Sequence, residues 1–125
     1  MKTLEIEKLF DRAYKAKAEN NYWNQIFELR KFVNEKIISE CFQRIDSDDL
    51  KYKKIGIDIL SQLGANRKNF IKQLFERFFL IFETSENEKL IYTSFMALGH
   101  NNQHLKTNHF KILLKFVDSR SKKIR

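Results

Sequence analysis

The sequence of 125 residues contains no proline, only three glycines and a single cysteine. Proline and glycine interrupt helices most strongly, so their scarcity predicts long helices joined by short connections. A single cysteine excludes an internal disulfide, and Cys41 lies among apolar neighbours in the segment IISECFQRI, where we expect a buried thiol. Gly56 and Gly64 are the closest pair of glycines, eight positions apart, which excludes a glycine-rich phosphate-binding loop.

Long apolar runs are also missing. The densest is FFLIF at residues 78–82, far shorter than the roughly 18 residues that a membrane-spanning helix needs. The first fifteen residues carry acidic side chains within their apolar pattern and show no signal-peptide core. The sequence therefore predicts no membrane association and, by default, a cytoplasmic location.

No set of residues typical of a catalytic or metal site is present. There is no serine–histidine–aspartate order with a nucleophile elbow, and Cys41 has no histidine near it in sequence. His100, His104 and His109 straddle an expected loop without any acid or cysteine inside it, so we expect loop and capping roles rather than metal ligation. The sequence predicts a protein that is not an enzyme and that holds no cofactor or metal.

The segment DSDDLKYKKIGI, residues 46–57, has the acidic density of a calcium-binding loop. It lacks the glycine that such a loop needs at its sixth position, which is Lys51, and the glutamate at its twelfth, which is Ile57. Acidic residues before a helix are better explained as N-caps, which accept hydrogen bonds from free backbone amides.

The charge is unbalanced, with 24 basic and 16 acidic residues and a net charge of +8 at pH 7. The excess is concentrated at the end, because residues 100–125 contain seven bases and one acid. A basic segment attracts nucleic acid, anionic membranes or acidic partners. Nucleic-acid binding through Lys51, Lys53, Lys54 and the C-terminal segment is therefore the alternative function, although a general bias in residue usage explains the same excess.

Apolar residues recur with helical spacing along nearly the whole chain, and no strand or hairpin pattern competes with it. We expect a capping serine at Ser85 before the sixth helix, with Glu88 completing the capping box, and glycine caps after helices at Gly64 and Gly99. The expected helices cover about residues 3–19, 21–32, 33–45, 49–63, 67–83, 86–99 and 106–117.

Two of these segments repeat. YKKIGIDILS at residues 52–61 aligns with LIYTSFMALG at residues 90–99, at an offset of 38. Gly56 then matches Ser94, which places small residues where we expect one helix to approach another closely. A further copy would begin near Ile124, and a weaker one begins at Tyr22. A period of about 36 residues with two helices per unit is typical of an α-solenoid.

These segments resemble the bacterial HEAT-repeat family, whose second helix commonly reads Val-Arg-x-x-Ala-x-x-Ala-Leu-Gly. The resemblance extends over about residues 20–125, with departures from the pattern at Tyr52, Leu90 and Ile91. It implies an all-α fold, an α-solenoid or superhelix of HEAT-like helix pairs with about seven helices and an incomplete last repeat. The whole chain would form one domain with units at about residues 3–32, 33–64, 67–100 and 106–125.

The last eight residues, DSRSKKIR, resemble the segment DSDDLKYK at residues 46–53. We therefore expect a turn at Asp118 and the first residues of another second helix. The helix before it would lack part of its cover at Leu113, Leu114, Phe116 and Val117. Either a longer repeat protein or a homo-oligomer formed through this uncapped end would supply that cover.

In solenoids of this family the second helices line the concave face, which binds partners. The resemblance thus implies a non-catalytic module that binds a protein or peptide along this face. Phe27, Ile57 and Phe95 occupy equivalent positions, and packing between helices is the competing explanation for them. Some HEAT-like solenoids are DNA glycosylases, but no matching Trp/Asp/Arg motif can be assigned here. The candidate partner-binding residues are Trp23, Phe27, Lys53, Lys54, Ile57, Ile91, Tyr92, Phe95 and Met96.

Overall fold

The computed structural model describes the backbone of residues 2–64 and 67–124 and the side chains of residues 4–64 and 67–118. Within these residues it contains seven α-helices, one short 3₁₀ helix and no strand, which confirms the all-α prediction. The helices are α1 (Lys2–Lys15), α2 (Glu19–Leu29), α3 (Glu35–Ile45), α4 (Leu50–Leu60), α5 (Ile71–Thr84), α6 (Glu88–His100), η1 (Asn102–His104) and α7 (Thr107–Ile124).

Side-chain caps set the starts of three helices. Asn34 accepts a hydrogen bond from the Ile37 amide at the start of α3. Asp49 accepts from the Lys51 and Tyr52 amides at the start of α4, as expected for an acid that precedes a helix. α6 is capped by Asn87 and not by Ser85, so that prediction is wrong. Ser85 lies two residues before the cap, and its hydroxyl accepts a hydrogen bond from the Asn87 amide.

The two glycines expected to end helices behave differently. Gly64 has a φ of +69°, in the left-handed region that glycine adopts at low cost, but α4 ends earlier at Leu60 with Ser61 as its C-cap, so the glycine cap predicted there is wrong. Gly99 lies inside α6, which continues to His100, so the predicted glycine cap is wrong. The turn there is held by Asn101, whose buried side-chain amide donates to the Ser61 and Ala97 carbonyls and accepts from Arg67.

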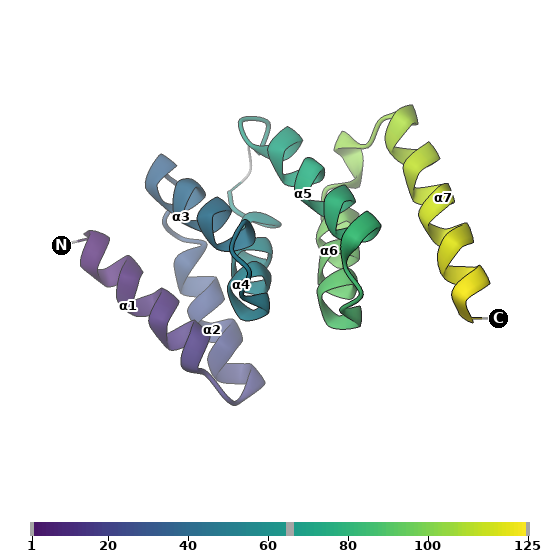
Figure 1. Cartoon of the computed structure of the whole chain (residues 1–125). Helices are drawn as coiled ribbons and strands as arrows, with labels where there is room; N and C mark the ends of the chain where they lie inside the picture. The colour runs from purple at the N-terminus through teal and green to yellow at the C-terminus, as the bar shows by residue number, and fades with distance from the viewer. Residues whose placement is uncertain (1, 65–66, 125) are drawn as a thin grey trace.

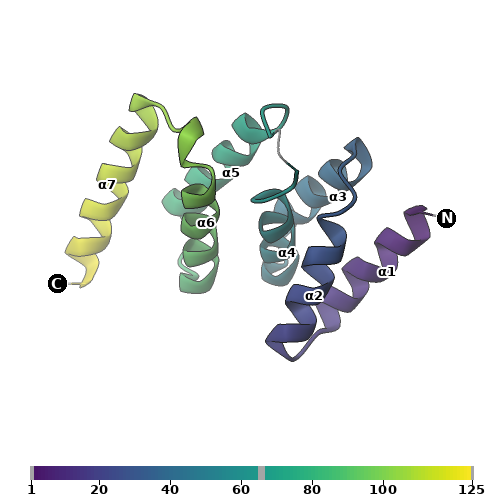
Figure 2. The same cartoon turned by 180° about the vertical axis from the view of Figure 1, so that it is seen from behind.

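The helices pack as successive pairs. α1 packs on α2, α3 on α4 and α5 on α6, and α4 also contacts α1, α2 and α6. The pairs follow one another in a row, with the two ends of the chain at opposite ends of the molecule (Figures 1 and 2). A continuous apolar core runs between the paired helices, with Phe78 among its largest fully buried side chains. α2, α4 and α6 consequently lie next to one another.

α7 departs from the prediction. It is helical without interruption from Thr107 to Ile124, so the turn expected at Asp118 is absent. No residue after Asp118 is a glycine or proline, and serine, arginine, lysine and isoleucine all continue a helix at modest cost. The side chains of residues 119–125, which include the basic C-terminal segment, lie outside the described part.

One face of α7 packs on the preceding pair, where the Phe116 ring lies 5.1 Å from Phe82 and 5.3 Å from Phe95 between centroids. The opposite face exposes apolar side chains at Phe110, Leu114 and Val117. Leu113 and Phe116 are half-buried, so only part of the helix lacks cover. In the part of the chain that is described, no helix combines the length and the apolar character needed to cross a membrane.

Candidate functional site

A hollow of about 660 Å³ lies across the adjacent helices α2, α4 and α6. Its lining residues recur with helical spacing on each of them: Trp23, Phe27 and Arg30 along and just after α2, and Lys54 and Asp58 on α4. Tyr92, Met96 and His100 line it from α6. Residues spaced by three or four positions share one face of a helix, so three helices present one face each to the same hollow. We call this hollow the groove.

The rim of the groove is apolar and open to solvent. Phe27 is 51%, Tyr92 65% and Met96 48% exposed, and all three contribute to the lining. Most large apolar side chains on a soluble protein are at least partly covered, and clustered exposed ones are typical of an interaction surface. The groove therefore offers three large apolar side chains, each about half exposed or more.

Trp23 forms the wall on the α2 side. Its ring packs edge-on against Tyr22 at 5.3 Å and lies 5.9 Å from the Phe27 ring. The Arg30 guanidinium lies 5.7 Å above the Trp23 ring, and the Lys54 amine lies 5.1 Å from it. These cations lie near the aromatic faces, which attract positive charge.

The floor of the groove contains a buried, neutralised acid. Asp58 is only 7% exposed, and its carboxylate accepts from the Lys54 amine at 2.6 Å and from the Tyr22 hydroxyl at 2.5 Å. Burial and the nearby Asp58 charge raise the pKa of the Tyr22 phenol, which therefore remains a donor. Lys54 balances the charge of Asp58, so this carboxylate does not make the groove acidic.

Arg30 has a different environment. Its Nε donates to the Asp58 backbone carbonyl at 3.0 Å, and its Nη2 donates to the same oxygen. No carboxylate of the described residues lies within ion-pair distance of it. Burial lowers the pKa of the guanidinium, but arginine remains charged in proteins. The groove thus contains a cation that hydrogen-bonds only to a neutral acceptor.

Five of the nine residues proposed from the sequence line the groove: Trp23, Phe27, Lys54, Tyr92 and Met96. The other four do not. Ile57 is fully buried and Ile91 is 5% exposed, so both belong to the core and cannot contact a partner. Phe95 stacks on Phe82 at 4.4 Å, and the Lys53 amine donates to the Ile45 carbonyl at 2.8 Å.

Arg30 is the main lining residue that the sequence prediction missed. It is the C-cap residue of α2 and lies inside the helix expected at about residues 21–32, but it was not assigned to the face of Trp23 and Phe27. The spacing of Trp23, Phe27 and Arg30, at i, i+4 and i+7, was a sufficient signal for one shared face. His100 was missed too, and it continues the face of Tyr92 and Met96 on α6 in the same way.

The three histidines lie elsewhere or act singly. Only His100 reaches the groove, while the His109 Nδ1 accepts a hydrogen bond from the Lys106 amide at the start of α7. No group of three or more histidine, cysteine, aspartate or glutamate side chains in the described residues is arranged to hold a metal ion.

Comparisons of the chain with protein-family models, curated proteins and solved structures find no match. Function is therefore inferred from the chemistry of the groove.

Proposed function

We propose that this protein is a HEAT-like helical-repeat module that binds a short segment of a partner protein in the groove. The succession of helix pairs, with the second helix of each pair along one face, supports the repeat assignment. The observation that carries the proposal is the groove itself, a hollow across three helices with exposed apolar side chains at its rim. Extended interaction surfaces of this kind are how helical-repeat proteins act on partners.

The lining residues define the chemistry of the segment. Apolar side chains would bury surface against Trp23, Phe27, Tyr92 and Met96, where rigid aromatic rings contribute contact area at little cost in conformational entropy. A carboxylate would pair with Arg30, because guanidinium groups bind carboxylates through parallel charge-assisted hydrogen bonds. The preferred ligand is thus an apolar segment that carries one acidic group.

Nucleic-acid binding through the lysines of α4 is less well supported. The amine of Lys51 donates to the Tyr14 carbonyl at 2.9 Å, that of Lys53 to the Ile45 carbonyl and that of Lys54 to Asp58. Each amine already donates one of its three N–H groups to an internal acceptor, which restricts how it could reach a phosphate. These contacts favour a structural role for the three lysines.

The proposal is tested by selecting binders from a phage-displayed library of random peptides and measuring the affinity of a selected peptide by fluorescence anisotropy. The double substitution Tyr92→Ala and Met96→Ala should weaken binding by about tenfold or more, because both side chains provide exposed contact area. Both are surface residues, so unfolding free energies should change by no more than about 0.5 kcal/mol each. Leu114→Ala on α7 is the matched control, since Leu114 is 71% exposed and does not line the groove.

Arg30 is tested separately with each selected peptide and its amidated counterpart, in which the acid is replaced by Gln or Asn. Arg30→Gln should remove the preference for the acidic form. The proposal fails if the library yields no saturable binder, or if binders are as sensitive to Leu114→Ala as to the groove variant. Binding of unrelated oligonucleotides with a steep salt dependence would favour the nucleic-acid alternative instead.

A further inference from the structure

α7 carries an apolar stripe on the side that faces away from the preceding helix pair. Phe110, Leu114 and Val117 follow one another at i, i+4 and i+7, so they share one face of the helix. They are 54%, 71% and 52% exposed, and Leu114 is the most exposed of the large apolar side chains described. α7 is the last helix in the row, and no described helix lies beyond this face (Figures 1 and 2). The stripe is therefore an unpartnered helix face of the kind that mediates protein association.

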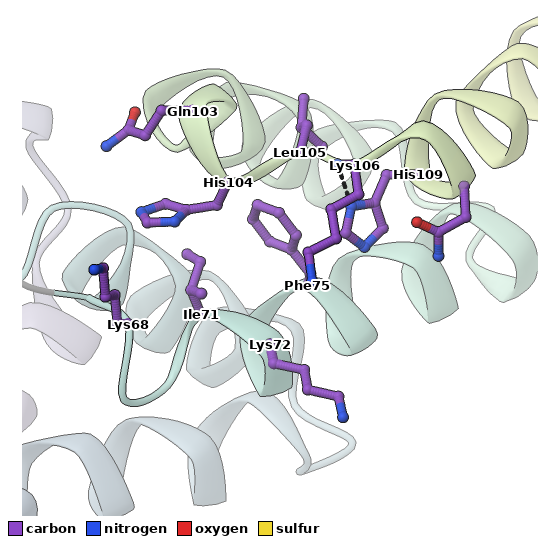
Figure 3. A pocket seen from close by; sticks show the side chains of 10 residues that line it. Lys68, Ile71, Lys72, Phe75, Gln103, His104, Leu105, Lys106 and His109 are labelled. Carbon is purple, nitrogen blue, oxygen red and sulfur yellow. Dashed lines mark hydrogen bonds between the residues drawn. The ribbon is translucent and has the colours of Figure 1, made fainter.

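The opposite face of α7 fixes how the stripe is presented. The Phe116 ring lies 5.3 Å from the Phe95 ring of α6 between centroids. Two turns earlier, the His109 ring lies 5.2 Å from the Phe75 ring of α5, and its Nδ1 accepts a hydrogen bond from the Lys106 amide (Figure 3). α7 is thus held on the preceding pair at two points. Covering the stripe consequently requires little further ordering of the helix, which favours association.

The first helix of the row offers no matching apolar surface. On α1, Leu4 is the one large apolar side chain that is exposed among those described. The other exposed positions of this helix include the acids Glu5, Glu7 and Asp11. Packing an apolar stripe over these carboxylates would remove their hydration without supplying hydrogen-bond donors. A head-to-tail contact between α7 of one copy and α1 of another is therefore unfavourable.

The stripe is instead complementary to itself when two copies meet in opposite directions. Lys111 and Asp118 are exposed and lie on the same side of the stripe, because seven residues make nearly two helical turns. Leu114 lies close to the midpoint between them, so an antiparallel pair centred on Leu114 places Lys111 of one copy across from Asp118 of the other, twice. Opposite charges at such flanking positions set the orientation and register of paired helices. Asp118 also has an interaction within its own chain, and a carboxylate accepts several hydrogen bonds at once.

We infer that the stripe binds a second copy of this chain, in a two-fold symmetric dimer whose α7 helices pack antiparallel. Phe110, Leu114 and Val117 of each copy pack against the same residues of the other, and Lys111 pairs with Asp118 at both ends of the contact. A single helix from each copy buries less than the roughly 1,200 Å² of a stable interface, so the expected Kd is on the order of 10 to 100 µM. Both copies use the same surface, so association stops at two. The stripe lies outside the groove, and the inference does not depend on the function proposed there.

Sedimentation equilibrium of the full chain, at concentrations from about 5 to 500 µM that bracket the expected Kd, tests the inference. The wild type should pass from monomer to dimer and form no larger species. A monomer at every concentration, or species that grow beyond the dimer, would overturn the inference. So would a monomer whose α7 amide NMR signals shift on addition of an acidic helical peptide, because a different protein would then be the occupant of the stripe.

Leu114→Lys and Leu80→Lys form a matched pair of variants. Both side chains are exposed, at 71% and 57%, and lysine is a strong helix former, so thermal unfolding of both variants should match the wild type. Leu114→Lys brings like charges together at the centre of the contact and should raise the Kd of the dimer by about tenfold or more. Leu80 lies on α5 outside the stripe, so Leu80→Lys should change the Kd by less than about twofold. Equal effects of the two variants would overturn the inference.

The antiparallel arrangement has a test of its own. Lys111→Glu and Asp118→Lys each replace two pairs of opposite charge by two pairs of like charge, so each should raise the Kd by about fivefold at low salt. The double variant exchanges the two charges and restores both pairs with their signs reversed. Its Kd should return to within about twofold of the wild type. A double variant that associates as weakly as either single variant would overturn the antiparallel pairing.

Discussion

Replacing Gly56 with alanine is expected to destabilise the protein, although alanine is the better helix former. Gly56 is a buried residue of α4 at the point where this helix crosses α3. A Cβ at this position would lie 2.6 Å from the Cys41 backbone oxygen and 2.7 Å from Cγ1 of Ile45. The Ile45 side chain can rotate, but a carbonyl within α3 cannot move without moving the helix.

The size of the effect follows from two opposing terms. Alanine normally stabilises a helix by about 1 kcal/mol relative to glycine. Forcing extra volume into a packed core costs up to about 3 kcal/mol when the backbone has to shift. Gly56→Ala should therefore lower the free energy of unfolding by about 2 kcal/mol. Gly99→Ala is the matched control, because Gly99 is also helical but its Cβ would meet no atom within 4 Å.

Urea denaturation followed by circular dichroism measures both variants. Gly56→Ala should lower the urea midpoint by about 1 M, given the usual slope for a small domain. Gly99→Ala should raise the free energy of unfolding by about 0.5 kcal/mol, less than the full helical gain because it lies near the end of α6. A Gly56→Ala protein as stable as the wild type, or a destabilised Gly99→Ala protein, would refute the close approach of α3 and α4 described here.

Three further outcomes are expected. Cys41 is fully buried, which raises the pKa of its thiol, so a thiol reagent should label the protein only at the rate of unfolding; rapid labelling of folded protein would contradict this. Asp58→Ala leaves the Lys54 amine and the Tyr22 hydroxyl without their acceptor. The free energy of unfolding measured by urea denaturation should fall by about 3 kcal/mol. An unchanged urea midpoint would contradict the buried cluster. The hydrogen bond from Arg44 lowers the pKa of Glu40 below its ordinary value of 4.5. The stabilisation from the ionised Glu40 carboxylate is therefore present above pH 4.5 and is lost as the pH falls through the lower pKa of the folded state. The Glu40→Gln variant should consequently lose less stability than the wild type between about pH 7 and pH 3.

The helices could be predicted from the sequence because apolar spacing is a local signal. Asp49 was placed correctly, since an acid just before a helix accepts hydrogen bonds from the nearest backbone amides. Ser85 and Gly99 were placed wrongly, because a competing residue nearby made the better contact. Asn87 reaches the Leu90 amide, and Asn101 is held by contacts from residues about 30 to 40 positions away. Such distant partners leave no local pattern.

The resemblance between the last eight residues and residues 46–53 predicted a turn that is absent. At Asp46 the chain leaves α3 because later residues provide the conditions for ending it: Asp49 caps the next helix, and Arg77 of α5 binds the Asp46 carboxylate at 3.0 Å. After Asp118 the backbone remains helical through Ile124. Similar residue types are therefore insufficient to end a helix. The end of α3 is stabilised by the capped start of α4 and by the contact of Asp46 with Arg77 of α5.

Residues that align at one position of the repeat also differ in exposure, which the repeat pattern does not predict. Phe27, Ile57 and Phe95 are equivalent in the sequence alignment, yet they are exposed, fully buried and half-buried. The difference follows from the number of neighbours, because α4 contacts α1, α2, α3 and α6, whereas α2 contacts only α1 and α4 among the major helix contacts. A repeat pattern therefore predicts which way a residue faces along its own helix, but the position of that helix in the row decides whether the face reaches solvent. The lining that α4 gives to the groove is consequently polar, at Lys54 and Asp58, while the exposed apolar lining comes from α2 and α6 on either side.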